Sequence, residues 1–241
     1  MQTLKLWAGA ALIVAVAITP SALFAADAIE TVEPAPAPPE YQIKAIEQSY
    51  YAAARIGAAF DAESRFGVLG TTVGNAYDTG YNFSVALGYG FNPAGLVNFR
   101  AEAELGYTQL DINSHTVAGL GKFSGADATG DASAVYGLAN GYLDYSLGAI
   151  TPFVSAGVGY GQLDLSQQGV TPTGVVMNDS AGGLAWQVGA GAAFAVTDSV
   201  TIDLGYRFFK VQDVGLSAVD GTQSDVDLES HQINLGIRKA F

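Results

Sequence analysis

The side chains in this sequence that could do chemistry begin with a set of arginines and carboxylates. They stand in segments where apolar and polar residues alternate, a pattern that places every second side chain on one face of a β-strand. On a shared face these groups could form ion pairs, line a solute path or supply a carboxylate pair for acid/base catalysis. The set consists of Arg55, Arg100, Arg207 and Arg238 with Glu102, Glu104 and Asp203, and Asp144 is a further candidate.

We favour ion pairs that close a crowded barrel interior. Glu102 and Glu104 would lie on one strand face, whereas glycoside chemistry needs two carboxylates across a cleft. A barrel of about eight strands is filled by its own side chains, so opposite charges inside it should pair. A gated path for small solutes remains the alternative. We assign no catalytic residue, no metal ligand and no cofactor to the chain.

Two histidines adjoin serines and could belong to an acyl-transfer site. Ser114 and His115 fall in a segment that we interpret as a loop, and Ser230 and His231 stand at the start of the last alternating segment. Adjacent strand residues point to opposite faces, so Ser230 and His231 should not pair. We therefore expect no enzyme, and a lipid-modifying enzyme is the less favoured alternative.

Five acidic residues close to the C-terminus form a cluster without an intervening base: Asp213, Asp220, Asp225, Asp227 and Glu229. Such a run is usually a solvated loop. Its spacing differs from that of an EF-hand calcium loop. We assign no metal site to it.

The elements that must position these groups are β-strands. Apolar or aromatic residues occupy every second place in the segments Tyr81–Phe91, Val97–Thr108, Val200–Phe208 and Gln232–Arg238. Small or polar residues occupy the places between them, which is the period of a strand. We expect the large apolar set to face lipid and the small or polar set to face the interior.

Weaker alternation predicts four more strands. Three of them follow the same pattern and span Tyr51–Phe60, Phe153–Gln162 and Leu184–Val196. The fourth, Ser133–Leu147, is ambiguous. We turn Asn140 and Asp144 inward, because a polar group facing hydrocarbon is costly.

Eight strands leave connections of alternating length. The gaps near residues 61–79, 111–132, 164–183 and 212–229 are long and polar, whereas those near 92–95, 148–151 and 197–199 are tight turns. Outer-membrane barrels have this rhythm and an even strand number. We therefore predict an all-β, eight-stranded antiparallel transmembrane up-and-down β-barrel over residues 50–241. A soluble barrel would invert the two faces.

The N-terminus predicts export. Lys5 precedes an apolar run over residues 6–18 and a breaker followed by small residues, which is the layout of a signal peptide. The run is shorter than the roughly 20 residues that span a bilayer. We expect a signal peptide over residues 1–25, cleaved between Ala25 and Ala28, with a retained helix as the alternative. Residues 26–49 should form a Pro-rich, acidic periplasmic lead-in.

Composition excludes several function classes. The chain has 10 basic and 23 acidic residues and a net charge of −13, so we expect no nucleic-acid partner. It contains no cysteine, which excludes disulfides and thiolate metal sites. Its mean hydropathy is +0.25 without a second long apolar run, so the hydrophobicity must be spread by alternation.

Several stretches, taken in order, resemble the opacity-type outer-membrane β-barrels of alphaproteobacteria, which are related in architecture to the membrane domain of outer membrane protein A. The likeness spans roughly residues 50–241, and one departure is Lys239, where the family often has an aromatic residue. The stretches are residues 138–145 (LANGYLDY), 151–160 (TPFVSAGVGY), 185–191 (AWQVGAG), 204–208 (LGYRF) and 235–241 (LGIRKAF).

The resemblance implies a surface protein of the cell outer membrane with a structural, envelope-integrity or adhesion role and no shared reaction. A narrow, porin-like channel for small solutes is the alternative function. Expected partners are outer-membrane lipids and lipopolysaccharide, the barrel-assembly machinery, and a host or surface ligand of the loops. The resemblance also implies that Phe241 is read as an assembly signal.

Overall fold

A computed structural model describes residues 49–68, 70–91, 96–171 and 174–241. Eight long strands form a closed antiparallel ring in which each strand pairs with the next one, and the last strand pairs with the first. This arrangement confirms the predicted eight-stranded up-and-down barrel. The ring strands are β1 (Ser49–Val68), β3 (Gly80–Phe91), β4 (Val97–Val117), β6 (Ala128–Tyr145), β7 (Ile150–Val170), β8 (Gly174–Ala195), β9 (Val200–Ser217) and β10 (Gln223–Ala240).

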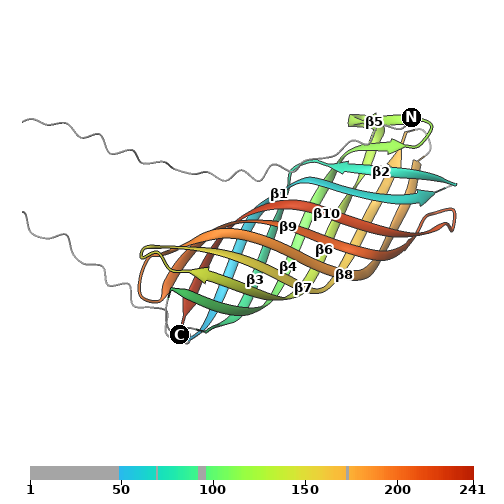
Figure 1. Cartoon of the computed structure of the whole chain (residues 1–241). Coiled ribbons are helices and arrows are strands. Elements are labelled where there is room, and N and C mark those ends of the chain that lie inside the picture. The colour runs from blue at the N-terminus through green and yellow to red at the C-terminus, as the bar shows by residue number, and fades with distance from the viewer. Residues whose placement is uncertain (1–48, 69, 92–95, 172–173) are drawn as a thin grey trace, which may run out of the picture. The chain divides into compact units, whose positions relative to one another are not determined.

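Two short strands complete the sheet at the end away from the C-terminus (Figure 1). Strand β2 (Thr71–Tyr77) pairs with both β1 and β4, and β5 (Gly121–Ser124) pairs with β4. A 3-10 turn, Gly125–Asp127, leads into β6. Among the described residues, none of the helical segments has the length and apolarity needed to cross a membrane.

The opposite end of the barrel, which we call the turn end, carries the tight turns and the C-terminus. Residues 146–149 and 196–199 connect neighbouring strands there; the first of these turns begins two residues before the predicted 148–151, and the second agrees with the predicted 197–199. The Ala240 N–H donates to the Ser199 carbonyl, and the Phe241 N–H donates to the Tyr50 carbonyl. The predicted signal peptide, the lead-in up to residue 48 and the turn at 92–95 lie outside the described residues.

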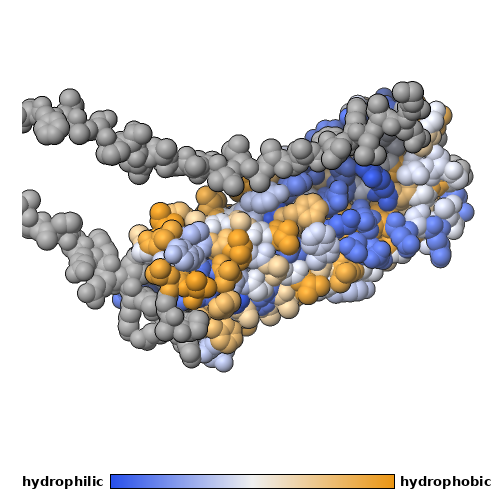
Figure 2. All heavy atoms as spheres, in the orientation of Figure 1, coloured by the Kyte–Doolittle hydropathy of each residue, from blue (hydrophilic) through white to orange (hydrophobic). Residues whose placement is uncertain are grey.

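The outer surface of the barrel is apolar from the turn end up to Phe60 on β1, Tyr107 on β4, Tyr160 on β7 and Phe208 on β9. We call this part the membrane half, because such a band is typical of a membrane-spanning barrel. Figure 2 shows the orange side chains gathered toward this end on the visible face. The predicted faces are confirmed, including the inward turn of Asn140 in β6.

The four predicted long loops are wrong. The strands continue through most of residues 61–77, 109–133, 162–183 and 210–230, where they form the part of the barrel that we call the distal half. His115, placed in a loop from its sequence, lies in β4 and is fully buried. Four of the five clustered acids also lie on strands, and Asp220 alone of these five lies in a turn.

β-Bulges explain why alternation seemed to stop where the distal half begins. Asp61, Gln167 and Asp213 have positive φ angles of 49°, 48° and 57°, and each lies at or beside a register shift in its strand pairing. An extra residue in a strand moves the following side chains to the opposite face. In β9, for example, Phe209 and Val211 point inward before the bulge, and Val214 and Leu216 point inward after it.

The distal half reverses the polarity of the membrane half. Its interior is an apolar core that includes Phe66, Leu110, Met177, Phe209 and Leu216, all 2% exposed or less. Its outer surface is charged, with thirteen acidic against three basic residues, none of them buried. The acids are Asp61, Glu63, Asp78, Asp111, Asp127, Asp131, Asp164, Asp179, Asp213, Asp220, Asp225, Asp227 and Glu229, and the bases are Arg65, Lys122 and Lys210.

Candidate functional site

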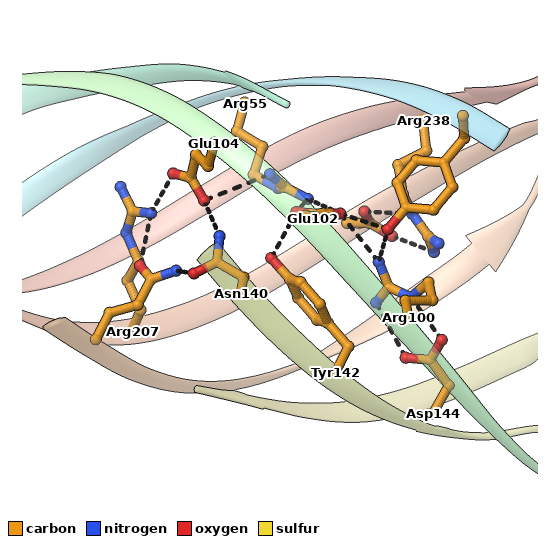
Figure 3. Close-up of polar contacts among 12 residues, drawn as sticks. Arg55, Arg100, Glu102, Glu104, Asn140, Tyr142, Asp144, Arg207 and Arg238 are labelled. Atoms are coloured by element: carbon orange, nitrogen blue, oxygen red, sulfur yellow. Dashed lines mark hydrogen bonds and ion pairs between the residues drawn. The ribbon is translucent and has the colours of Figure 1, made fainter. Parts of the chain in front are cut away.

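The interior of the membrane half holds the charged residues that the sequence singled out. Strand β4 supplies three of them at alternate places, because residues 100, 102 and 104 share one strand face. The others come from β1, β6, β9 and β10, and the ring brings all of them into the lumen (Figure 3). They are Arg55, Arg100, Glu102, Glu104, Asp144, Asp203, Arg207 and Arg238.

Arg100 is held by a bidentate pair at the turn end of this network. Its Nε and Nη2 donate to the two carboxylate oxygens of Asp144 over 2.6 and 3.0 Å. Its Nη1 donates to Glu102 over 3.3 Å. The fork of a guanidinium matches a carboxylate in this geometry. Arg100 therefore links two acids on neighbouring strands.

Glu102 is the centre of the network. Arg55 Nη2 donates to both of its oxygens, at 2.7 and 2.8 Å. The hydroxyls of Tyr51 and Tyr142 donate to the same carboxylate over 2.8 and 2.9 Å. With the bond from Arg100, the Glu102 carboxylate accepts hydrogen bonds from two arginines and two tyrosines.

Glu104 and Arg207 form a second centre closer to the distal half. Arg207 Nη1 donates to Glu104 over 2.8 Å, and the Asn140 amide donates to the same carboxylate over 2.7 Å. Arg207 also donates to Gln187, to Gln232 and to the Tyr136 hydroxyl. The ring of Tyr136 lies over Gly106, where a Cβ would collide with it, so this position needs glycine.

Arg238 and Asp203 pair separately, through two hydrogen bonds of 2.7 and 2.9 Å. The lumen thus holds four guanidinium groups and four carboxylates, without a net charge. Buried charges are tolerated when they are paired and hydrogen-bonded. These ion pairs connect different strands and stabilise the barrel. Their geometry does not leave a reactive group free for a substrate.

Polar residues outside the predicted ion-pair set complete the network, and the sequence had already placed Asn140 among them on the inner face. They are Tyr51, Tyr136, Asn140, Tyr142, Gln187 and Gln232. All stand at inward places of their strands, so the strand phase was a signal that could have found them. Which acid each one binds depends on the neighbouring strands.

A cavity of about 320 Å³ opens at the turn end of the lumen. Arg100, Asp144 and Arg238 line it together with Thr201 and Phe241. Of these residues, Arg100 and Asp144 are paired with each other and Arg238 is paired with Asp203. Phe241, predicted to be an assembly signal, is exposed at this end.

The two serine–histidine pairs do not form a nucleophile–base pair. Ser230 is buried and bonded to Gln232, whereas His231 lies on the outer surface. The His231 Nδ1 lies 2.5 Å from the Tyr206 hydroxyl, and its Nε2 lies 4.0 Å from the Asp61 carboxylate. This orientation agrees with the prediction that adjacent strand residues point apart.

His115 is bonded inside the distal half. Its Nε2–H donates to the Thr129 carbonyl over 2.9 Å, and its Nδ1 lies 2.8 Å from the Asn75 side-chain oxygen. Burial lowers the pKa of the His115 imidazole, and the bond to Thr129 only partly offsets this effect. The imidazole is therefore a neutral structural group rather than a general base facing solvent.

On the distal surface, Lys210 bridges two members of the acidic cluster. Its Nζ lies 2.8 Å from Asp227 and 3.7 Å from Glu229. The hydrogen bond to Asp227 raises the pKa of Lys210. Burial alone would raise the pKa of Asp227, but its bonds to Lys210 and to the Asp213 N–H outweigh burial and lower it. The ion pairs of Lys210 thus stabilise part of this acidic face.

Comparisons with known proteins agree with this architecture. A family model described as outer membrane protein beta-barrel domain matches residues 8–241. The outer membrane protein PagN of Salmonella typhimurium is 35% identical over 116 residues, which cover 43% of this chain and 48% of PagN. An uncharacterised protein of Brucella abortus is 28% identical over 151 residues, 55% of this chain and 52% of that protein.

The chain spans about half the length of these curated relatives. Among solved structures, the outer membrane protease OmpT of Escherichia coli is similar with a TM-score of 0.50 and 7% identity. The match covers 83% of this chain and all of OmpT. At that identity the likeness concerns the fold alone.

Proposed function

This chain belongs to the family of outer membrane protein β-barrel domains and lies in the outer membrane, and from that premise we propose that it is a non-catalytic surface protein. One observation carries the proposal: its strands continue past the apolar band into a distal half with its own apolar core and an acidic surface. A protein that only sealed a membrane would not need this extension. The distal half serves envelope integrity or adhesion through contacts outside the membrane.

The distal half can make such contacts because its structure is rigid. Strand pairing between β9 and β10 continues to Ser217 and Gln223, and a distal core lies beneath it. A preorganised surface loses little conformational entropy when it binds a partner. The excess of acidic groups favours a cationic partner surface, or divalent cations that bridge to lipopolysaccharide phosphates.

A replacement of the distal β9–β10 hairpin tests this function. Residues 213–227 would be exchanged for a two-residue turn, leaving the membrane half of the chain unchanged. We expect the variant to reach the outer membrane while cells that produce it lose attachment to surfaces or become permeable to large antibiotics. Attachment and permeability equal to those of the parent would contradict the proposal.

A narrow channel is the second candidate, favoured only by the cavity at the turn end. Against it stands the distal core, whose side chains such as Leu110, Leu163 and Phe209 are solvent-excluded and apolar. A hydrated ion meets a high cost in such surroundings. We expect no steady conductance in planar bilayers, and discrete conductance steps would favour the channel.

A lipid-modifying enzyme has less support. Ser230 and His231 point to opposite faces, and Ser114 and His115 are buried in the distal half. An acyl-release assay on lipopolysaccharide with the parent and a His231→Gln variant tests this reading. Release that depends on His231 would overturn the non-catalytic assignment.

Export and assembly complete the proposal. Residues 1–25 would direct secretion, residues 26–49 would lead into the barrel from the periplasm, and Phe241 would be recognised by the barrel-assembly machinery. The even number of ring strands supports this orientation, because it places Ser49 and Phe241 at the same end.

A further inference from the structure

The cavity at the turn end is large enough for a small ligand. Its volume of about 320 Å³ lies at the lower end of the range of ligand-binding pockets, roughly 300–1,000 Å³. Tyr51 and the Arg100–Asp144 pair form part of its wall. Beyond them, toward the distal half, lie the ion-pair network and then the apolar core. A ligand would therefore enter and leave the cavity through the turn end.

Arg238 offers this cavity a hydrogen-bond donor. It lines the cavity, and its side chain is 6% exposed. Its Nε and Nη2 donate to Asp203, whereas Nη1 has no hydrogen-bond partner among the described residues. Nη1 differs from the enclosed polar atoms of the lumen, because it remains accessible to solvent. A guanidinium with an open edge is suited to a carboxylate of a ligand.

Asp198 offers a negative charge at the mouth of the same cavity. It lies in the turn between β8 and β9 and is exposed. Its carboxylate forms neither a hydrogen bond nor an ion pair with another residue of the described chain. Thr201, three residues later, stands opposite Arg238 in the register of β9 and β10. Asp198 therefore lies nearer to the mouth than Arg238 does.

The charges of the lining restrict what the cavity can bind. A simple anion would be attracted by Arg238 but repelled by Asp198, and a simple cation would meet the reverse. A ligand with one negative and one positive end avoids both repulsions, provided that its negative end points inward. The lining thus favours a zwitterion whose carboxylate reaches Arg238 and whose ammonium group stays at the mouth.

The spacing of the two groups sets the length of the ligand. Three residues of extended chain span at most about 10 Å, and this limit applies to the separation of Asp198 from Thr201. The charged ends of an extended dipeptide lie about 7 Å apart. The side chains of Asp198 and Arg238 can bridge the rest. Tyr51 and Ala240, which also line the cavity, offer apolar surface for small side chains on such a peptide.

We propose that the turn-end cavity binds a short zwitterionic peptide of dipeptide length, with its carboxylate on Arg238 and its ammonium group on Asp198. The hydroxyls of Ser199 and Thr201 line the cavity between these two groups and bond to the peptide amide. Because the apolar distal core closes the other half of the barrel, the peptide is held at one end and does not pass through. In the proposed membrane orientation this end faces the periplasm.

Titration of the refolded protein in detergent micelles tests the site, with dialanine as the probe, and does not depend on the surface role proposed above. Protein NMR should show saturable shifts of the Thr201 and Arg238 backbone amides and none of Leu216 in the distal core. N-acetyl-dialanine lacks the positive end and dialanine amide lacks the negative end, so each should bind more weakly than dialanine. Equal binding of either derivative, or no saturable shift with dialanine, would overturn the proposal.

Two variants supply the second arm, and the heat-modifiable mobility shift verifies that each is folded. Asp198→Asn should weaken dialanine binding about two- to fivefold, as expected for an ion pair at an exposed rim, and should leave N-acetyl-dialanine binding unchanged. Thr201→Trp should abolish dialanine binding, because the indole fills the cavity. Asp225→Asn, which removes an exposed acid of the distal half, is the matched control. Unchanged dialanine affinity in either the Asp198 or the Thr201 variant would contradict this site.

Discussion

At the scale of single residues, the arginines of the lumen differ from those on the surface by how fully each is bonded. Arg100 has a 3% exposed side chain and donates to Asp144 and Glu102. Arg65 has a 74% exposed side chain and forms an ion pair of 3.4 Å with Glu63. The two residues form a matched pair for measuring what burial contributes.

An Arg100→Met variant should lose about 3–5 kcal/mol of unfolding free energy, because Asp144 and Glu102 keep buried charges without their partner. Arg65→Met should lose less than about 1 kcal/mol, since exposed ion pairs contribute little. Urea unfolding in detergent micelles, followed by the heat-modifiable mobility shift, measures both. An Arg100 variant as stable as the parent would mean that the lumen is freely hydrated.

His115 should make the distal half sensitive to acid. Burial lowers its pKa in the folded protein below the usual value of 6.5. Below about pH 6.5 the unfolded chain therefore binds a proton that the folded chain does not, so stability falls as pH falls. A His115→Gln variant should show a weaker loss of stability between pH 7 and about pH 5.

The measurement is the urea midpoint at several pH values for the parent and the variant. Carboxylates contribute equally to both proteins, so their difference isolates the histidine. The chain has two histidines, and His231→Gln is the control because its side chain is 34% exposed. Parallel pH profiles for the parent and the His115 variant would refute a buried, neutral imidazole.

At the scale of the strands, the same β9 strand faces lipid at one end and a protein core at the other. Leu204 in the membrane half points outward and is 51% exposed, whereas Leu216 in the distal half is fully buried. Leu216→Ala should destabilise the folded protein by about 2–5 kcal/mol, because it leaves a cavity in the core. Leu204→Ala should lower the unfolding free energy in detergent by clearly less. Equal losses for the two variants would contradict a packed distal core.

Protease sensitivity distinguishes strands from loops in the distal half. Backbone within a paired strand is a poor substrate, whereas exposed loop tips are preferred sites of cleavage. Proteinase K added to intact cells should cut near residues 118–120 and 218–222, where the structure has turns. Rapid cleavage throughout 111–132 or 212–229 would instead support the long loops that the alternation pattern predicted. Mass spectrometry of the fragments locates the cuts.

At the scale of the whole molecule, the proposed assembly signal Phe241 can be tested by deletion. Phe241 is 75% exposed at the turn end, and its backbone N–H donates a hydrogen bond to the Tyr50 carbonyl on β1. Deleting Phe241 should lower the amount of folded, heat-modifiable protein in the outer membrane and leave unfolded chains in the periplasm. Lys239→Tyr should be neutral or improve assembly, because an aromatic side chain suits the membrane interface.

Fractionation followed by electrophoresis of boiled and unboiled samples measures this effect. A Phe60→Ala variant, altered at the other rim of the membrane half, controls for a general loss of apolar surface. A normal folded yield after the deletion would show that Phe241 is not an assembly signal.

The sequence by itself determined the class of fold and the membrane face of the barrel. In segments such as Tyr81–Phe91 every second residue is apolar, and this period of two is a local property of each strand. It placed Arg100, Glu102 and Glu104 on one inner face, and this placement did not require knowing which strands pair with theirs. The interior position of Asn140 followed from the cost of turning an amide to lipid.

Only the tertiary structure decided how far the strands run and what each luminal group binds. Bulges at Asp61 and Asp213 reverse the alternation, so a reading based on a constant period ends the strand where the strand in fact continues. The partners of Glu102 come from β1, β4 and β6, and this set depends on the register between strands. Register is a relation between distant segments, and no local pattern in one strand contains it.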